Sequence, residues 1–149
     1  MTSPTQRLEV TLETALESVD LAESIVMRVA EAAGYSEDEV HKLGMAVREG
    51  VVNAYNYGNA QDRQKKILLA VEFEAEHMVV HICDEGCGFE LGEVPDPLAE
   101  ENLLRTSGRG IFLMRAFTDD LAVHKRPGGG ADLVMHKKLP HRHAGHGRP

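Results

Sequence analysis

The chain has 149 residues, of which 42% are hydrophobic and 27% charged, a composition typical of one globular domain with its own core. Its formal net charge of −8 is the opposite of the basic surplus of a general nucleic-acid binder, so we expect no direct nucleic-acid contact. No apolar run approaches the roughly 18 residues of a membrane span, and the first residues lack an apolar signal-peptide core. With only Cys83 and Cys87 present, a disulfide framework is excluded, and we expect a cytoplasmic protein with reduced thiols.

The first 34 residues predict a strand and a helix. Apolar and polar residues alternate over residues 7–12, which is typical of a half-buried strand. A helix should follow, capped by Ser18 and stopped by Gly34. Its expected buried face consists of Leu21, Ile25, Val29 and Ala32.

The second predicted helix carries an unusual polar face. It begins with a capping box formed by Ser36 and Glu39, and it should run to about Tyr57. Its apolar stripe consists of Val40, Leu43, Val47, Val51 and Ala54. At 100° per residue, Glu49, Asn53 and Asn56 project from the opposite face. An ordinary solvated face is one interpretation, but asparagine is a poor choice for an exposed helix, which leaves a functional site as the other.

The remaining residues predict two hairpins separated by a long connection and a helix. Strands at 66–74 and 78–83 should form the first hairpin, and strands at 121–126 and 131–139 the second. Between them lie a proline- and glycine-rich loop at 90–107, interpreted as a lid, and a helix at 111–117. We therefore expect an α+β two-layer sandwich, with helices on one face of a mostly antiparallel sheet, as one domain over residues 1–139. Residues 140–149 should form a disordered tail.

Two glycine-containing motifs add candidate binding residues. Residues 84–89 place Asp84 at a strand end, where its carboxylate can accept a hydrogen bond from an exocyclic amine. Gly86 and Gly88 would let the backbone approach a flat ligand closely. Residues 106–110 open onto the helix at 111–117, whose N-terminal N–H groups suit phosphate oxygens. Taken singly, the first motif is better explained as a glycine-rich turn leaving a strand, and the second as a glycine-assisted helix start.

In this order, the three motifs resemble the GHKL ATPase superfamily, which includes gyrase and the sensor histidine kinases. The segments "LGMAVREGVVNAYNYGN", "ICDEGCGF" and "SGRGIFLMRAF" look most like the small single-domain anti-sigma-factor serine kinases. The resemblance spans residues 7 to 139 and implies the GHKL fold. It also implies ATP and Mg²⁺ as cofactors.

The resemblance assigns roles residue by residue. Glu49 would be the catalytic general base, and Asn53 would bind ATP through Mg²⁺. Asp84 would bind the adenine amine, with Gly86 and Gly88 beside the base. The residues expected at the phosphates are Arg105, Thr106, Ser107, Gly108, Arg109, Gly110 and Ile111. Two positions depart from the family pattern: Tyr57 stands where histidine is frequent, and Ala131 where threonine is frequent.

The resemblance implies an anti-sigma factor with serine/threonine kinase activity. Its partners would be a sigma factor, which it sequesters, and an anti-anti-sigma protein of STAS type, which it phosphorylates; a homodimer is compatible with the family. A nucleotide-responsive binding module without kinase activity is the alternative, and a kinase of a stress-signalling complex would have the same ATP site. Glu49 favours a kinase, because a pure binding module has no use for a general base.

Overall fold

The computed structural model of the protein describes residues 6–86 and 110–140. The predictions for Gly88, for the lid and the segment up to Arg109, and for the tail from residue 141 lie outside this part of the chain. The elements in chain order are β1 (Gln6–Glu13), α1 (Leu16–Ala33), α2 (Glu37–Asn53), the π-helical turn η1 (Ala54–Gly58), β2 (Lys66–Phe73), β3 (His77–Cys83), α4 (Gly110–Phe117), β4 (Asp120–Lys125) and β5 (Ala131–Lys138).

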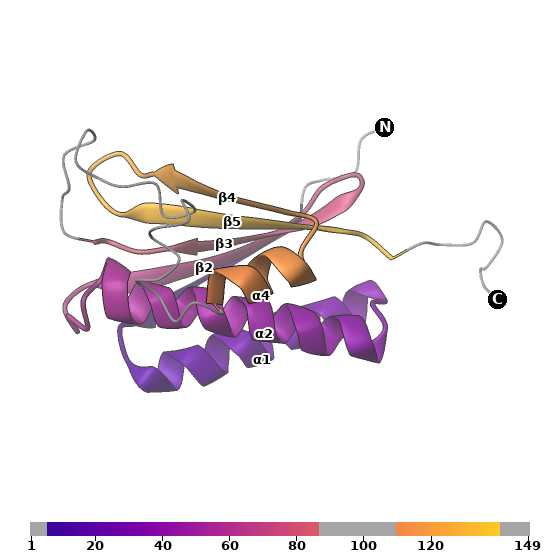
Figure 1. The fold of residues 1–149 in the computed structure, drawn as a ribbon, viewed down its shortest axis with the longest axis horizontal. Helices are drawn as coiled ribbons and strands as arrows, with labels where there is room; N and C mark the ends of the chain where they lie inside the picture. The colour runs from indigo at the N-terminus through magenta and orange to yellow at the C-terminus, as the bar shows by residue number, and fades with distance from the viewer. Residues whose placement is uncertain (1–5, 87–109, 141–149) are drawn as a thin grey trace, which may run out of the picture.

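The molecule consists of a sheet layer and a helix layer, which confirms the predicted α+β sandwich. The five strands pair antiparallel throughout, in the order β1-β2-β3-β5-β4. Among the described residues, the helices α1, α2 and α4 lie on one face of the sheet, with α2 between the other two (Figure 1). Both predicted hairpins are present. Because β5 pairs with β3 as well as with β4, the end of β3 lies beside the start of β5.

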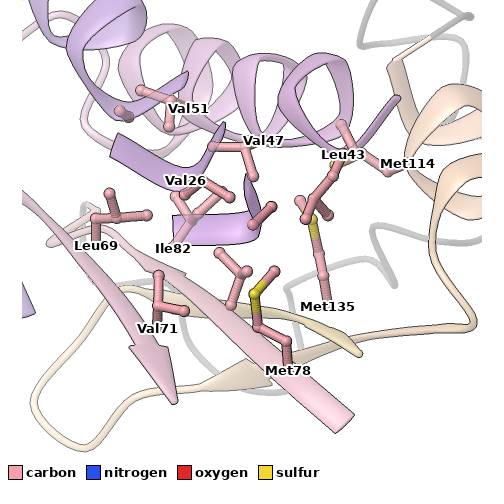
Figure 2. Close-up of a cluster of buried hydrophobic side chains, with 14 of the residues drawn as sticks. Val26, Leu43, Val47, Val51, Leu69, Val71, Met78, Ile82, Met114 and Met135 are labelled. Carbon is pink, nitrogen blue, oxygen red and sulfur yellow. The ribbon is translucent and has the colours of Figure 1, made fainter. Parts of the chain in front are cut away.

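The core fills the space between the two layers (Figure 2). The predicted apolar stripe of α2 is confirmed, because all five of its residues are buried. Facing them are alternate residues of the strands, among them Leu69 of β2, Ile82 of β3 and Met135 of β5. Full burial of one such side chain contributes about 1.5–3 kcal/mol, so this stripe holds α2 firmly on the sheet.

The predicted cap of α1 is wrong, and its predicted buried face is only partly right, because Ile25 and Val29 pack half-buried at the edge of the core. The helix begins two residues before Ser18, and the Ser18 hydroxyl instead donates a hydrogen bond to the carbonyl of Glu13 at 2.6 Å. The face that is buried consists of Ser18, Val19, Ala22, Val26 and Ala30. Leu21 is half exposed, at 50% of its surface. Small side chains let α1 approach its neighbours closely, and this close packing outweighs the larger but peripheral Leu21.

The capping box at the start of α2 is confirmed, with the Glu39 amide donating to the Ser36 hydroxyl at 3.1 Å. At the other end the helix continues to Gly58, as expected, but its last turn widens into the π-helical turn η1. Close to this end, a Cβ added at Gly50 would lie 2.6 Å from Cδ1 of Ile82. The bare glycine therefore lets α2 lie tightly against β3 at the residue next to Glu49.

Candidate functional site

The polar face of α2 presents Glu49 and Asn53 one turn apart, and both are half-buried. Among the described residues, neither side chain makes a hydrogen bond or an ion pair. The neighbouring Arg48 is directed to α1 instead, where its guanidinium contacts Asp20 at 2.6 Å and Glu23 at 2.9 Å. The carboxylate of Glu49 and the carboxamide of Asn53 are therefore available to a ligand that brings its own partner groups.

Asn56 and Tyr57, the polar residues that follow this pair, belong to the turn η1. Asn56 accepts a hydrogen bond from the side chain of Gln61 at 3.0 Å, an exposed local contact. Tyr57 is exposed over 52% of its surface. Neither observation gives Asn56 or Tyr57 a role in binding.

Asp84 follows β3 directly and is buried. Its Oδ1 atom accepts hydrogen bonds from the amides of Gly86 at 2.9 Å and Ala131 at 3.1 Å. The Asp84 amide donates to the carbonyl of Ala131 at 2.9 Å, and its carbonyl accepts from the guanidinium of Arg126 at 2.8 Å. Both peptide groups and one carboxylate oxygen of Asp84 are thus fixed, while Oδ2 receives no hydrogen bond from the described residues.

The surroundings of Asp84 determine how strongly its carboxylate accepts a hydrogen bond. Burial raises the pKa of the carboxyl group above its ordinary value, whereas the hydrogen bonds from the Gly86 and Ala131 amides and the nearby Arg126 act to lower it. An acceptor removed from water gains more from a single well-placed donor than an exposed one does. Asp84 is therefore suited to bind an N–H group of a ligand through Oδ2.

Three glycines let backbone segments close around Asp84. A Cβ at Gly58 would lie 2.2 Å from Asp84 Oδ2, and one at Gly86 would lie 2.6 Å from the carbonyl oxygen of Gly58. Gly130, with φ of +93°, would place a Cβ 2.0 Å from the Asp84 carbonyl oxygen. The end of η1, the end of β3 and the turn before β5 therefore meet at this one residue.

The predicted residues Glu49, Asn53, Asp84 and Gly86 belong to connected segments of the structure. Asn53 precedes Gly58 by five residues, or about 8 Å along a helix axis, and Gly58 touches Asp84. The helix that begins at Gly110 and includes Ile111 packs against α2, as α4. The predicted residues Gly88 and Arg105 to Arg109 lie outside the described part of the chain.

The contacts of Gly58, Gly130 and Arg126 with Asp84 could not be predicted from the sequence. Gly58 has the pattern of a helix stop, and Gly130 that of a hairpin turn, so their local roles concealed their contact with Asp84. The amide of Ala131 contacts Asp84 through the backbone, so this contact needs no threonine hydroxyl. A signal for these contacts exists only in three dimensions, since the segments are more than 25 residues apart in sequence.

The described residues hold no group of three or more His, Cys, Asp or Glu side chains that could cage a metal ion. Mg²⁺ is commonly held by one or two protein oxygens together with substrate phosphates, and it does not require such a cage. Cys83 is a free, buried thiol whose pKa burial raises to about 12, so it remains protonated. No helix among the described residues has the length and apolar character needed to cross a membrane.

A helix that presents Glu49 and Asn53 and continues to a glycine packed against a buried aspartate at a strand end, on a sandwich of this topology, is the arrangement expected of a GHKL-class ATPase domain. The sequence matches the histidine kinase-like ATPase domain over residues 12–137, and the chain belongs to this family. The predicted superfamily is thereby confirmed.

Curated relatives are similar over most of the chain. A serine-protein kinase RsbW from Oceanobacillus iheyensis is 27% identical over 118 residues, which cover 75% of this chain and 75% of the relative. An anti-sigma F factor from Bacillus subtilis is 31% identical over 104 residues, or 68% of this chain and 71% of the relative. The anti-sigma F factor of Clostridium perfringens strain SM101 is 30% identical over 68% of this chain and 74% of its own length. These similarities confirm the resemblance to anti-sigma-factor kinases.

A solved structure has the same fold. The crystal structure of the RsbU and RsbW domains of a Mycobacterium tuberculosis protein superposes with a TM-score of 0.65 at 16% identity. The match covers 92% of this chain and 33% of that longer chain. At this identity the likeness concerns the fold, and it supports the GHKL-type sandwich described above.

Proposed function

We propose that the protein is an anti-sigma factor with ATP-dependent serine/threonine kinase activity. The structural observation that carries the proposal is the half-buried Glu49, which has no partner among the described residues and lies one turn before Asn53 on a helix that reaches Asp84. The names of the curated relatives, anti-sigma F factor and serine-protein kinase, support the same class of function. The whole domain, residues 1–139, would carry this activity.

The base of ATP would bind at Asp84. Its Oδ2 atom would accept a hydrogen bond from the exocyclic amine of adenine, while Gly86 and Gly88 leave room for the ring. The phosphates would extend toward the start of α4, where Gly110 and Ile111 follow the predicted segment from Arg105 to Arg109. Free N–H groups at a helix start and the arginine side chains both suit phosphate oxygens.

The side-chain oxygen of Asn53 on α2 suits Mg²⁺. Asn53 offers an uncharged side-chain oxygen with no partner among the described residues, which is the kind of hard ligand that Mg²⁺ accepts beside phosphates and water. When bound, Mg²⁺ would neutralise phosphate charge during transfer. Asn53 would hold the ion from one side only, because the described residues contain no cage of metal-ligating side chains.

Glu49 would serve as the general base. Its carboxylate would take the proton from the hydroxyl of a serine or threonine, while that oxygen forms a bond to the γ-phosphorus and the bond to the ADP oxygen breaks. Because Arg48 is held on α1 by Asp20 and Glu23, it does not pair with Glu49 and leaves the carboxylate free. This arrangement suits proton transfer at the edge of the ATP site.

The phosphate acceptor would be an anti-anti-sigma protein of STAS type, and the second partner a sigma factor held without phosphorylation. The net charge of −8 suits a partner with a basic surface. In the alternative, the protein is a nucleotide-responsive binding module and transfers no phosphate. The free Glu49 favours the kinase, because a binding module would have no use for a half-buried carboxylate without a partner on this face.

The kinase proposal predicts a large effect of Glu49→Gln on phosphate transfer. The substitution keeps the shape of the side chain but removes the base, so transfer of label from γ-labelled ATP to a STAS protein should fall about 10²- to 10⁴-fold. Glu31→Gln, on the exposed end of α1, is the matched control and should leave the rate unchanged. Transfer by Glu49→Gln at the wild-type rate would refute the role of Glu49, and no transfer by the wild-type protein would favour the binding module.

A further inference from the structure

A fully buried asparagine lies directly behind the proposed adenine site. Asn59 follows η1 and has no exposed surface. Its Nδ2 atom donates to the Thr14 hydroxyl at 2.7 Å and to the carbonyl of Lys66 at 3.0 Å. Its Oδ1 atom accepts from the amide of Glu85 at 2.7 Å. The carboxamide therefore joins the ends of three segments: the residue after β1, the start of β2 and the residue pair after β3.

The hydrogen-bond partners of Asn59 are themselves held by further hydrogen bonds. The Thr14 hydroxyl, also buried, donates to the carbonyl of Lys65 at 2.6 Å while it accepts from Asn59. The amide of Lys66 donates to the Glu85 carboxylate at 2.8 Å. Both Nδ2 protons and the Oδ1 atom of Asn59 are thus in use, and no other residue type of this size offers two donors and an acceptor in this arrangement.

This network ends at the backbone of Asp84. Asn59 Oδ1 holds the amide of Glu85, which belongs to the peptide group that follows Asp84. The carbonyl of the same peptide group accepts from Arg126. On the other side, Gly58, the residue before Asn59, lies against Asp84 Oδ2. The position of Asn59 therefore determines both where the Asp84 peptide lies and which surface faces the free oxygen of its carboxylate.

We propose that Asn59, supported by Thr14, is a positioning residue that aims Asp84 Oδ2 at the exocyclic amine of adenine and so determines the preference for an adenine nucleotide. The inference rests on the proposed function, because it assumes that Asp84 binds the base. Without the carboxamide, the segment that follows β3 loses its tie to Thr14 and keeps only the Lys66–Glu85 hydrogen bond to the start of β2, so Oδ2 loses its fixed direction. A hydrogen bond to a base depends on this direction, whereas contacts of the phosphates do not.

The test compares the dissociation constants of ATP and ITP for the full chain. ITP has a carbonyl oxygen where ATP has the amine, so it cannot donate to Asp84, and the wild-type protein should bind ATP at least about tenfold more tightly. Asn59→Ala and Asn59→Asp should reduce this ratio about tenfold by weakening ATP and leaving ITP nearly unchanged. Thr14→Val should reduce it in the same direction, and Thr14→Ser, which keeps the hydroxyl, should retain it.

Two controls separate positioning from general stability. Tyr35→Phe removes buried hydrogen bonds to the carbonyls of Lys137 and Lys138, at the other end of β5, and should leave the ratio unchanged. Asn56→Ala removes an exposed bond on η1 and should also leave it unchanged. If Asn59→Ala fails to fold, Thr14→Val carries the test.

The outcomes distinguish the inference from the proposed function. A wild-type ratio retained in both Asn59→Ala and Thr14→Val would overturn the positioning role while the adenine site stands. Equal weakening of ATP and ITP by these variants would show a structural role alone and would also overturn it. Equal binding of ATP and ITP by the wild-type protein would refute the adenine site at Asp84, and the inference with it.

Discussion

Gly58 has both a local role in its helical turn and a tertiary role beside Asp84. It ends η1, and it also provides the space that the carboxylate of Asp84 occupies. Its φ angle is not in the left-handed region, so the backbone conformation itself would accept alanine. An alanine would instead clash with Asp84, because its Cβ would lie 2.2 Å from Asp84 Oδ2.

We therefore expect Gly58→Ala to displace Asp84. The overlap should cost about 1–3 kcal/mol of unfolding free energy, as overpacking of a filled site does, and should weaken ATP binding at least tenfold. Asn56→Ala, on the same turn, is the control and should leave ATP binding unchanged. Urea unfolding and calorimetric titration with ATP measure the two effects, and unaltered ATP affinity in Gly58→Ala would show that Oδ2 does not contact the nucleotide.

The residues proposed to carry chemistry could be predicted where local spacing reveals them. Glu49 and Asn53 stand out because helical periodicity places them opposite the apolar stripe, and Asp84 because it follows a strand within a glycine motif. Asn59 could not be recognised in the same way. Its partners are the residue after β1, the first residue of β2 and a residue shortly after β3, and only the tertiary fold brings them to its side chain.

At the scale of elements, α2 is the support of the site. Its capping box fixes where the helix begins, its apolar stripe fixes which face meets the sheet, and the bare Gly50 fixes how closely it lies. The sequence predicted the first two correctly, because both follow from local patterns. The buried face of α1 was only partly predicted, because two overlapping apolar stripes were available, and close packing through small residues selected the one with Ala22 and Ala30.

Ser36→Ala should destabilise the protein without altering its site. Loss of the cap leaves the amide of Glu39 without its acceptor and should lower the unfolding free energy by about 1 kcal/mol, as measured by urea denaturation. Ser36→Asp retains an acceptor and should keep wild-type stability. ATP affinity should be unchanged in both variants, because Ser36 lies at the opposite end of α2 from Asn53. Equal stability of Ser36→Ala and the wild-type protein would show that the capping box contributes nothing to the free energy of unfolding.

At the scale of the whole molecule, the strand order brings the site together. The insertion of β5 between β3 and β4 places Ala131 beside Asp84, and the helix layer brings η1 to the same point. The hairpins could be predicted from the sequence, but the position of β5 in the sheet could not, because pairing between distant strands leaves no local signal. The proposed binding of the ATP base by Asp84 therefore depends on the tertiary fold, which brings three segments together at this residue.

Calorimetric titration of ATP into Asp84→Asn in the presence of Mg²⁺ tests this claim most directly. The substitution keeps the size of the side chain but places an uncharged amide in a site arranged for a carboxylate, so ATP binding should be abolished, while the wild-type protein binds. Circular dichroism of the variant should show that the fold is retained. If a folded Asp84→Asn protein binds ATP with wild-type affinity, Asp84 does not bind the base.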